Sequence, residues 1–261
     1  MSLTLAATLV GLGGAGGFSA GLLGLGGGVL MFPLLYYIPP LMGSTLGAKT
    51  VAAVVVSQVF FSTLAGSIAH FRSGHVQRRI ALTAGTLSAL SAFIGSVASH
   101  WASEHFLLVL FGMVTLLVVL VMLLPAPSQS AEQTTVEHVT VPQLPLSFFA
   151  LSTGLVIGFL GAGNFMFVPL MVYVLRVPTR IAIGSSLVIA VMNTAGGFLG
   201  KLLTGQIPLL SAALVVIGAS LGAVAGERAH GRVSSVALRR IYGGLVTFIA
   251  LRIWLTIFGV D

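Results

Sequence analysis

The sequence has little charge, no cysteine and no carboxylate in the middle of any long apolar stretch. Only 7% of its 261 residues are charged, whereas a soluble domain has about 25%. The absence of cysteine excludes disulfides, thiolate metal sites and thiol catalysis. No charged residue precedes Lys49, so the basic region that opens a cleaved signal peptide is missing and such a peptide is not expected.

Long apolar runs fill most of the chain, which is 57% hydrophobic with a mean hydropathy of +1.10. A transmembrane helix needs about 20 apolar residues. Charge-free runs of at least this length cover 50–71, 80–103, 138–175, 181–200 and 202–226. They predict an all-α polytopic membrane protein surrounded by the lipid bilayer. The net charge of +7 comes mainly from basic residues in short loops between these runs, so no nucleic acid partner is expected.

A polar linker divides the chain into two similar halves. The segment 125–145 holds four of the ten prolines, which predicts a first membrane repeat over 1–124 and a second over 146–261. At an offset of 131, Lys49 aligns with Arg180 and Gly95 with Gly226. Glycine-rich breaks align at an offset of 137. The alignment predicts a duplicated unit, in which one glycine-broken segment precedes three transmembrane helices.

Counting basic residues favours an inverted arrangement of these repeats. If each broken segment crosses the membrane once, the repeats are parallel and the two sides carry five and seven basic residues. This difference is too small to assign either side to the cytoplasm. If each broken segment enters and leaves on one side, the second repeat is inverted and the sides carry nine and three. The nine are Arg72, Arg78, Arg79, Arg176, Arg180, Arg228, Arg232, Arg239 and Arg240, and the three are Lys49, Lys201 and Arg252.

The two breaks are candidate anion-binding segments. Non-helical backbone is tolerated in a membrane only where it is buried in protein or lines a cavity. A short helix is expected after each break, and its first N–H groups have no intrahelical partner and form a positive dipole end. The alternative is that the glycines only allow close helix packing. The candidate residues are Gly24, Gly26, Gly27, Gly28, Gly161, Gly163 and Asn164.

Three further polar residues are candidates. Lys49 and Arg180 each begin a long helix just after a half-helix, where they could attract an anion or lie at the membrane interface. Asn193 aligns with Ser62 in the other half, within apolar runs where an unpaired polar group is costly. Asn193 could therefore donate to a bound oxyanion or join two helices. The sequence predicts no cofactor, and it is compatible with a homodimer without establishing one.

The residues around the first break resemble a known family. The run Gly21–Leu34 resembles the signature of the TauE/SafE family of sulfite exporters, and so does Ile181–Leu187 in the second half. The resemblance implies a multi-pass inner-membrane exporter of a small anion such as sulfite or an organosulfonate. The second break, Gly-Ala-Gly-Asn, departs from the triple glycine of the first, and Ala53–Val55 lacks the hydroxyls of its counterpart Gly184–Ser186.

Two other functions fit parts of the pattern. An anion channel of the same architecture would use the same broken helices. An intramembrane hydrolase would use Ser185 or Ser186 with a histidine, but His230 lies in a basic loop and no oxyanion-hole motif accompanies it. The sequence therefore predicts a transporter rather than an enzyme.

Overall fold

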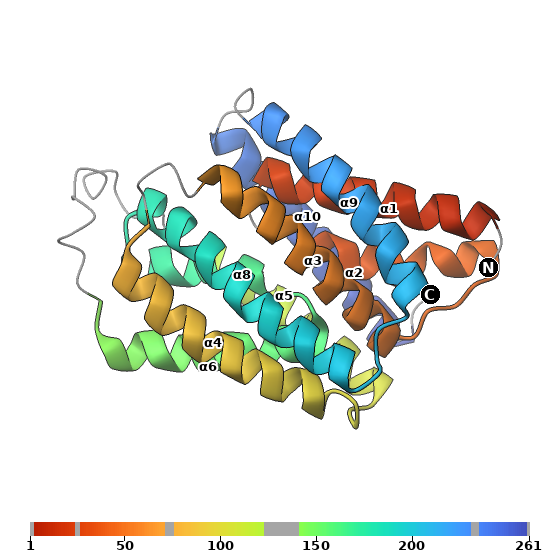
Figure 1. The fold of residues 1–261 in the computed structure, drawn as a ribbon, viewed down its shortest axis with the longest axis horizontal. Coiled ribbons are helices and arrows are strands. Elements are labelled where there is room, and N and C mark those ends of the chain that lie inside the picture. The colour runs from red at the N-terminus through yellow and green to blue at the C-terminus, as the bar shows by residue number, and fades with distance from the viewer. Residues whose placement is uncertain (1–2, 24–26, 71–75, 123–140, 231–234, 260–261) are drawn as a thin grey trace.

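The computed structural model of the chain describes residues 3–23, 27–70, 76–122, 141–230 and 235–259. These residues form a helical bundle without strands in the described ranges (Figure 1). Six of the helices are long and apolar enough to cross a membrane, which confirms the prediction of an all-helical membrane protein. These six are α1 (Leu3–Leu23), α4 (Arg78–Ala98), α5 (Glu104–Met122), α6 (Gln143–Leu160), α8 (Thr179–Leu203) and α9 (Leu209–His230). Two further long helices are α3 (Ala48–His70) and α10 (Ser235–Ile257).

Each half contains a shorter segment after its break. In the first half this segment is α2 (Gly28–Tyr37), followed by the 3₁₀ turn η1 (Pro39–Met42). The expected second half-helix is instead a 3₁₀ turn, η4 (Asn164–Met166), one α turn, α7 (Phe167–Pro169), and a π-helical segment, η5 (Leu170–Val174). Pro169 has no N–H to continue the α-helical ladder, and the wider turn closes with Leu175 N–H donating to the Leu170 carbonyl, 3.1 Å away.

The first broken segment is a hairpin. Gly27, just before α2, lies against Gly16 and Ala20 of α1. Further along, the Thr8 hydroxyl donates to Met42 Sδ over 3.0 Å, so the end of this segment returns to the start of α1. The α1 and α2 segments therefore run antiparallel, and the chain enters and leaves this hairpin at one end of the bundle.

Each broken segment packs against the other half of the chain. Helix α1 runs parallel to α9, with Gly17 facing Ala219, and α6 runs parallel to α4, with Gly154 facing Ser88. The two contacts are equivalent in the repeat alignment, because Gly17 aligns with Gly154 at the offset of 137 and Ser88 aligns with Ala219 at the offset of 131. A Cβ at Gly17 or Gly154 would overlap a backbone carbonyl oxygen of the facing helix. These glycines are packing positions that allow close helix approach.

A methyl group in the α1–α9 contact should destabilise the protein. We expect Gly17→Ala to cost about 1–3 kcal/mol, because the new Cβ forces two helix backbones apart. Gly11→Ala on the same helix is the matched control, since a Cβ there meets nothing within 4 Å. Thermal unfolding in detergent, followed by size-exclusion chromatography, measures the difference. Equal melting temperatures for the two variants would contradict the described contact.

Two ends of the bundle can be defined by their contacts. At the Lys49 end, Lys49 Nζ donates to the His100 carbonyl and Lys201 Nζ to Ser99 Oγ. At the Gln77 end, the Gln77 N–H donates to Ser185 Oγ. The start of α3 therefore lies at the same end as the end of α8, and these two helices, adjacent in Figure 1, run antiparallel.

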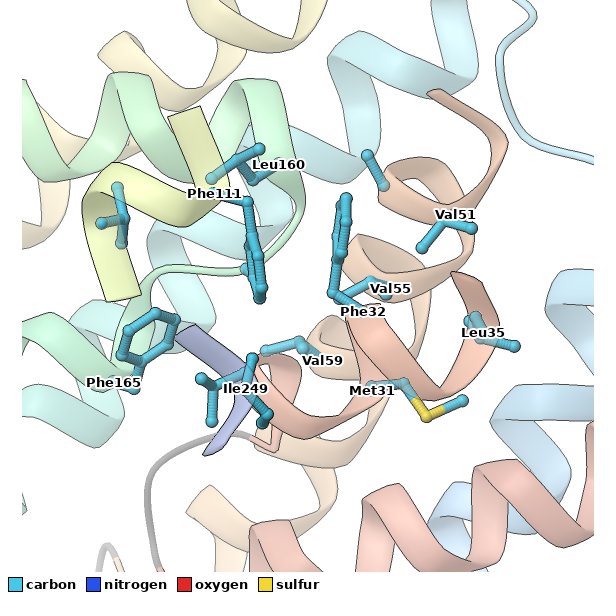
Figure 2. Packing of buried hydrophobic residues seen from close by; sticks show 14 of the residues in the cluster. Met31, Phe32, Leu35, Val51, Val55, Val59, Phe111, Leu160, Phe165 and Ile249 are labelled. Atoms are coloured by element: carbon cyan, nitrogen blue, oxygen red, sulfur yellow. The ribbon is translucent and has the colours of Figure 1, made fainter. Parts of the chain in front are cut away.

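The surface and the centre of the bundle are both apolar. Large hydrophobic side chains point outward from the long helices, as expected of a protein in contact with lipid; they include Leu82, Leu90, Phe148, Leu221 and Phe248. The central cluster contains residues of both halves (Figure 2). From the first half, Phe32 of α2 stacks on Phe111 of α5 at a centroid distance of 4.3 Å. Leu160 and Phe165, on either side of the second break, belong to the same cluster.

Candidate functional site

The two glycine breaks meet beside the middle of α3. A Cβ at Gly28 would lie 3.1 Å from Val59 Cγ2 and 3.2 Å from the Ala162 Cβ. A Cβ at Gly161 would overlap the carbonyl oxygen of Ala52, two turns earlier on α3. The first break, the second break and α3 thus converge in the interior, where the absence of side chains at the glycines permits the contact.

The first break ends in the N-terminus of α2. Gly27 has φ of +65°, a left-handed conformation that favours glycine. Its carbonyl oxygen accepts hydrogen bonds from the N–H groups of Leu30 and Met31, at 3.2 and 3.1 Å. The first N–H groups of α2 have no acceptor within the helix, and they form its positive dipole end. Gly24 and Gly26 lie outside the described residues.

The second break carries a polar side chain. Gly161 ends α6 with φ of +69°, and its N–H donates to the Ile157 carbonyl over 2.7 Å. After Gly163, Asn164 begins η4 at the position that corresponds to Gly27 in the first half. The turns η4, α7 and η5 follow one another without interruption from Asn164 to Val174, so a helical segment follows this break as α2 follows the first. The second break adds the amide side chain of Asn164 at the position of Gly27.

Asn164 and Asn193 come together, although they are far apart in the sequence. Asn193 Nδ2 on α8 donates to Asn164 Oδ1 over 2.9 Å, and both side chains are buried. Asn164 Nδ2 and Asn193 Oδ1 find no hydrogen-bond partner among the described residues. Buried polar atoms are nearly always paired, so this donor and this acceptor call for a partner from outside the protein, such as a water molecule, an ion or a bound solute.

A second buried polar pair lies on α3. Gln58 Nε2 donates to Ser62 Oγ over 3.1 Å, and Gln58 Oε1 finds no partner in the described part of the chain. Ser62 corresponds to Asn193 in the repeat alignment, and Gln58 adjoins Val59, which contacts the first break. Each break therefore has a buried polar pair near it, Gln58–Ser62 on α3 for the first and Asn164–Asn193 for the second. The pairs are related, because Ser62 of α3 and Asn193 of α8 are equivalent in the repeat alignment.

The predicted basic pair is not brought together. Lys49 lies half-buried at the Lys49 end, where its Nζ donates to the His100 carbonyl over 2.9 Å. Its backbone N–H donates to Glu104 Oε2 over 3.1 Å. Arg180 is in the first turn of α8, at the Gln77 end, and its side chain lies outside the described residues. The two residues therefore belong to opposite ends of the bundle, separate from the meeting point of the breaks.

Lys201 is a candidate that the sequence analysis did not select. It is fully buried near the end of α8, and its Nζ donates to Ser99 Oγ at 2.7 Å and Gln206 Oε1 at 3.3 Å. Both partners are neutral, and it is the only charged residue buried among those described. A signal was present, since Lys201 is the one charged residue between Arg180 and Glu227. Its place near a helix end is equally typical of an interfacial lysine.

The described side chains include no group of three or more His, Asp or Glu residues that could hold a metal ion. The chemistry of the interior is instead that of amide, hydroxyl and backbone hydrogen bonds. Such groups can bind and release a small polar solute. No histidine stands beside the buried Ser185 or Ser186 in a hydrogen bond of the kind that activates a nucleophile, within the described contacts.

Comparison with known proteins agrees with this architecture. The profile of the family described as Sulfite exporter TauE/SafE matches residues 9–253. Two proteins of Xylella fastidiosa strains, each named probable membrane transporter protein, are similar: one is 33% identical over 93% of this chain and 92% of its own length. The other is 39% identical over 68% and 67%. YdhB of Bacillus subtilis, also named a probable membrane transporter protein, is 22% identical over 85% of this chain and 89% of its own length.

No solved structure matches the chain. The family profile covers both glycine breaks and all or most of each long helix around them. The chain therefore belongs to the sulfite exporter TauE/SafE family and is a membrane transporter, not an enzyme.

Proposed function

We propose that the protein is a secondary transporter that exports a small sulfur-containing anion, such as sulfite or an organosulfonate, across the cell inner membrane. The observation that carries this proposal is the convergence of the two breaks, which brings the N-terminus of α2 close to the second break with its Asn164–Asn193 amide pair. The proposed binding residues are Gly24, Gly26, Gly27, Gly28, Gly161, Gly163, Asn164 and Asn193, with Lys49 and Arg180 attracting the anion at the two ends.

The charge of the interior supports an anion. Helix N-termini and amide N–H groups stabilise negative oxygens. The buried side chains of the described residues include no carboxylate that could balance a cation, and the one buried side chain with a titratable group among them is the basic Lys201. Desolvation of an unpaired cationic solute would be costly in such an environment.

The two halves are proposed to be inverted repeats that alternate around this shared site. The antiparallel course of α3 and α8, which are corresponding helices, supports this arrangement. The described basic residues also separate by end. Arg78, Arg79, Arg176, Arg180, Arg228, Arg239 and Arg240 belong to segments at the Gln77 end, against Lys49, Lys201 and Arg252 at the other. The Gln77 end is therefore proposed to be cytoplasmic.

Cysteine labelling tests the orientation. The sequence has no cysteine, so single substitutions Ser73→Cys and Ser234→Cys report one position each. In the sequence, Ser73 stands between α3 and α4, and Ser234 stands between α9 and α10. We expect an impermeant maleimide to label both only from the cytoplasmic side, in inside-out vesicles and not in whole cells. Labelling from opposite sides would contradict the inverted arrangement and favour parallel repeats.

Counterflow in liposomes tests the function itself. Purified protein is reconstituted with unlabelled sulfite inside, and uptake of radiolabelled sulfite is measured with sulfite, sulfate, thiosulfate, sulfoacetate or a simple carboxylate as competitor. We expect saturable exchange that sulfur oxyanions or sulfonates inhibit best. Conduction without counterflow would indicate a channel, and exchange of a cation would contradict the proposed function.

The Lys201→Met variant tests whether Lys201 is needed for transport or only for stability. Removal of the ammonium leaves Ser99 Oγ and Gln206 Oε1 within 3.0 Å of each other, so they remain hydrogen-bonded. Replacing a buried charge with an apolar side chain of similar size is often neutral or stabilising. We expect an unchanged or higher melting temperature but sulfite exchange reduced by about tenfold or more, a loss of about 1.4 kcal/mol. Arg252→Met at the same end is the matched control, and wild-type exchange by Lys201→Met would exclude a role for its charge.

A further inference from the structure

The hydrogen-bonding capacity of the Asn164–Asn193 pair exceeds what the protein itself satisfies. One hydrogen bond joins the two amides, and it leaves Asn164 Nδ2 and Asn193 Oδ1 without partners among the described residues. The same number of unpaired atoms remains if both amide groups are turned so that their oxygen and nitrogen atoms change places. In either orientation one amide nitrogen and one carbonyl oxygen remain unpaired, because each bonded amide uses one of its two polar atoms.

The pair is shielded from bulk solvent. Asn193 is 0% exposed and Asn164 7% exposed, and Gln58, also 0% exposed, has an unpaired Oε1 on the helix that contacts the first break. The interior near the breaks therefore presents acceptors as well as donors. A fully deprotonated oxyanion has only acceptor oxygens, so it would satisfy the free nitrogen and leave the carbonyl oxygens unpaired and facing negative charge.

We propose that the transported anion carries a hydrogen-bond donor of its own, a hydroxyl or amino group beside its charged oxygens. The anionic oxygens bind Asn164 Nδ2 and the N–H groups at the start of α2, and the donor binds Asn193 Oδ1. Hydrogen sulfite and hydroxy- or aminosulfonates have this chemistry, whereas sulfate and alkanesulfonates do not. The inference rests on the proposed function and names the substrate class of the same site.

The wild-type protein tests this with isosteric anions. Counterflow of radiolabelled sulfite is measured with 2-hydroxyethanesulfonate or 1-propanesulfonate as competitor, which differ by a hydroxyl in place of a methyl group. A site that bonds a substrate hydroxyl rejects the analogue that lacks it. We expect the hydroxyl compound to inhibit at a concentration at least about tenfold lower. Equal inhibition, or stronger inhibition by 1-propanesulfonate, would overturn the inference while the proposed function stood.

A double variant tests whether the Asn164–Asn193 pair causes the preference for the sulfonate with a hydroxyl group. The double variant Asn164→Leu with Asn193→Leu removes both carbonyl oxygens of the pair, whereas Asn193→Leu alone would release Asn164 Oδ1 as a new acceptor. We therefore expect the ratio of the two inhibitory concentrations to fall toward one in the double variant. Ser57→Ala on α3 is the matched control, because its buried hydroxyl donates only to the Ala53 carbonyl of its own helix, 2.8 Å away. If the double variant does not fold, the wild-type ratio alone decides. A protein that exchanges no anion at all would instead contradict the proposed function.

Discussion

Gly27→Val should abolish sulfite exchange while the protein still inserts into the membrane. Gly27 has φ of +65°, which a β-branched residue adopts only with strain. Its Cβ would lie 2.5 Å from the Gly16 carbonyl oxygen and 2.8 Å from the Ala20 Cβ. The start of α2 would have to move away from α1, and the N–H groups offered to the anion would move with it.

Initial rates of counterflow measure this effect, with membrane insertion and a monodisperse elution profile as the test of folding. Gly11→Val, at a position where a Cβ meets nothing within 4 Å, is the control and should exchange sulfite normally. Gly163→Val should resemble Gly27→Val, because its Cβ would lie 2.7 Å from Ile157 Cγ1. Normal rates in both variants would show that the breaks only allow helix packing.

Asn193→Asp should reduce exchange by about a hundredfold or more with little change in side-chain size. The substitution replaces the amide that donates to Asn164 with a carboxylate, which repels both Asn164 Oδ1 and an anionic substrate. Two unit charges 4 Å apart at an effective dielectric constant of 20 interact with about 4 kcal/mol. Initial rates at pH 8 for wild type and variant measure the loss.

Asn193→Ser is the matched control for this charge effect. It introduces the residue found at the corresponding position of the first half, Ser62, and it keeps a neutral polar group. We expect its rate to lie between those of wild type and Asn193→Asp. If the serine and aspartate variants are impaired equally, the position is structural and charge repulsion is not the cause.

The local pattern of the sequence predicted most of the helices. The charge-free runs 50–71, 80–103, 181–200 and 202–226 each contain most of one helix, α3, α4, α8 and α9, and the glycine break before α2 is visible in the sequence itself. A short helical segment is expected after each break, and the structure has one after both. The second is built of 3₁₀, α and π turns, which apolar composition does not distinguish.

Partner choice between helices was harder to predict. The alignment of the halves identified corresponding residues but did not show that α1 would pack on α9 of the other half. A pattern was available, because Gly218, Gly222 and Gly226 form one stripe of α9 that faces α1. Small residues at this spacing indicate a close helix contact without naming the other helix.

The candidate site was predicted in part. The backbone breaks, Asn164 and Asn193 were selected individually from their polarity and spacing, and the structure places the two asparagines in contact. That contact joins residues 29 apart in the sequence, so it depends on the tertiary fold. Lys201 was missed because burial near a helix end cannot be distinguished from an interfacial position in the sequence. The roles of all these residues in anion binding remain predictions.

The central claim is that an anion binds where the two breaks meet, and equilibrium dialysis of the purified protein with radiolabelled sulfite tests it most directly. Gly28→Ala places one methyl group between Val59 and Ala162, and Gly14→Ala places one where the nearest atom is 3.8 Å away. We predict that Gly28→Ala weakens sulfite binding by about tenfold or more, about 1.4 kcal/mol, and that Gly14→Ala binds as the wild type does. Unchanged affinity in a folded Gly28→Ala protein would contradict the claim.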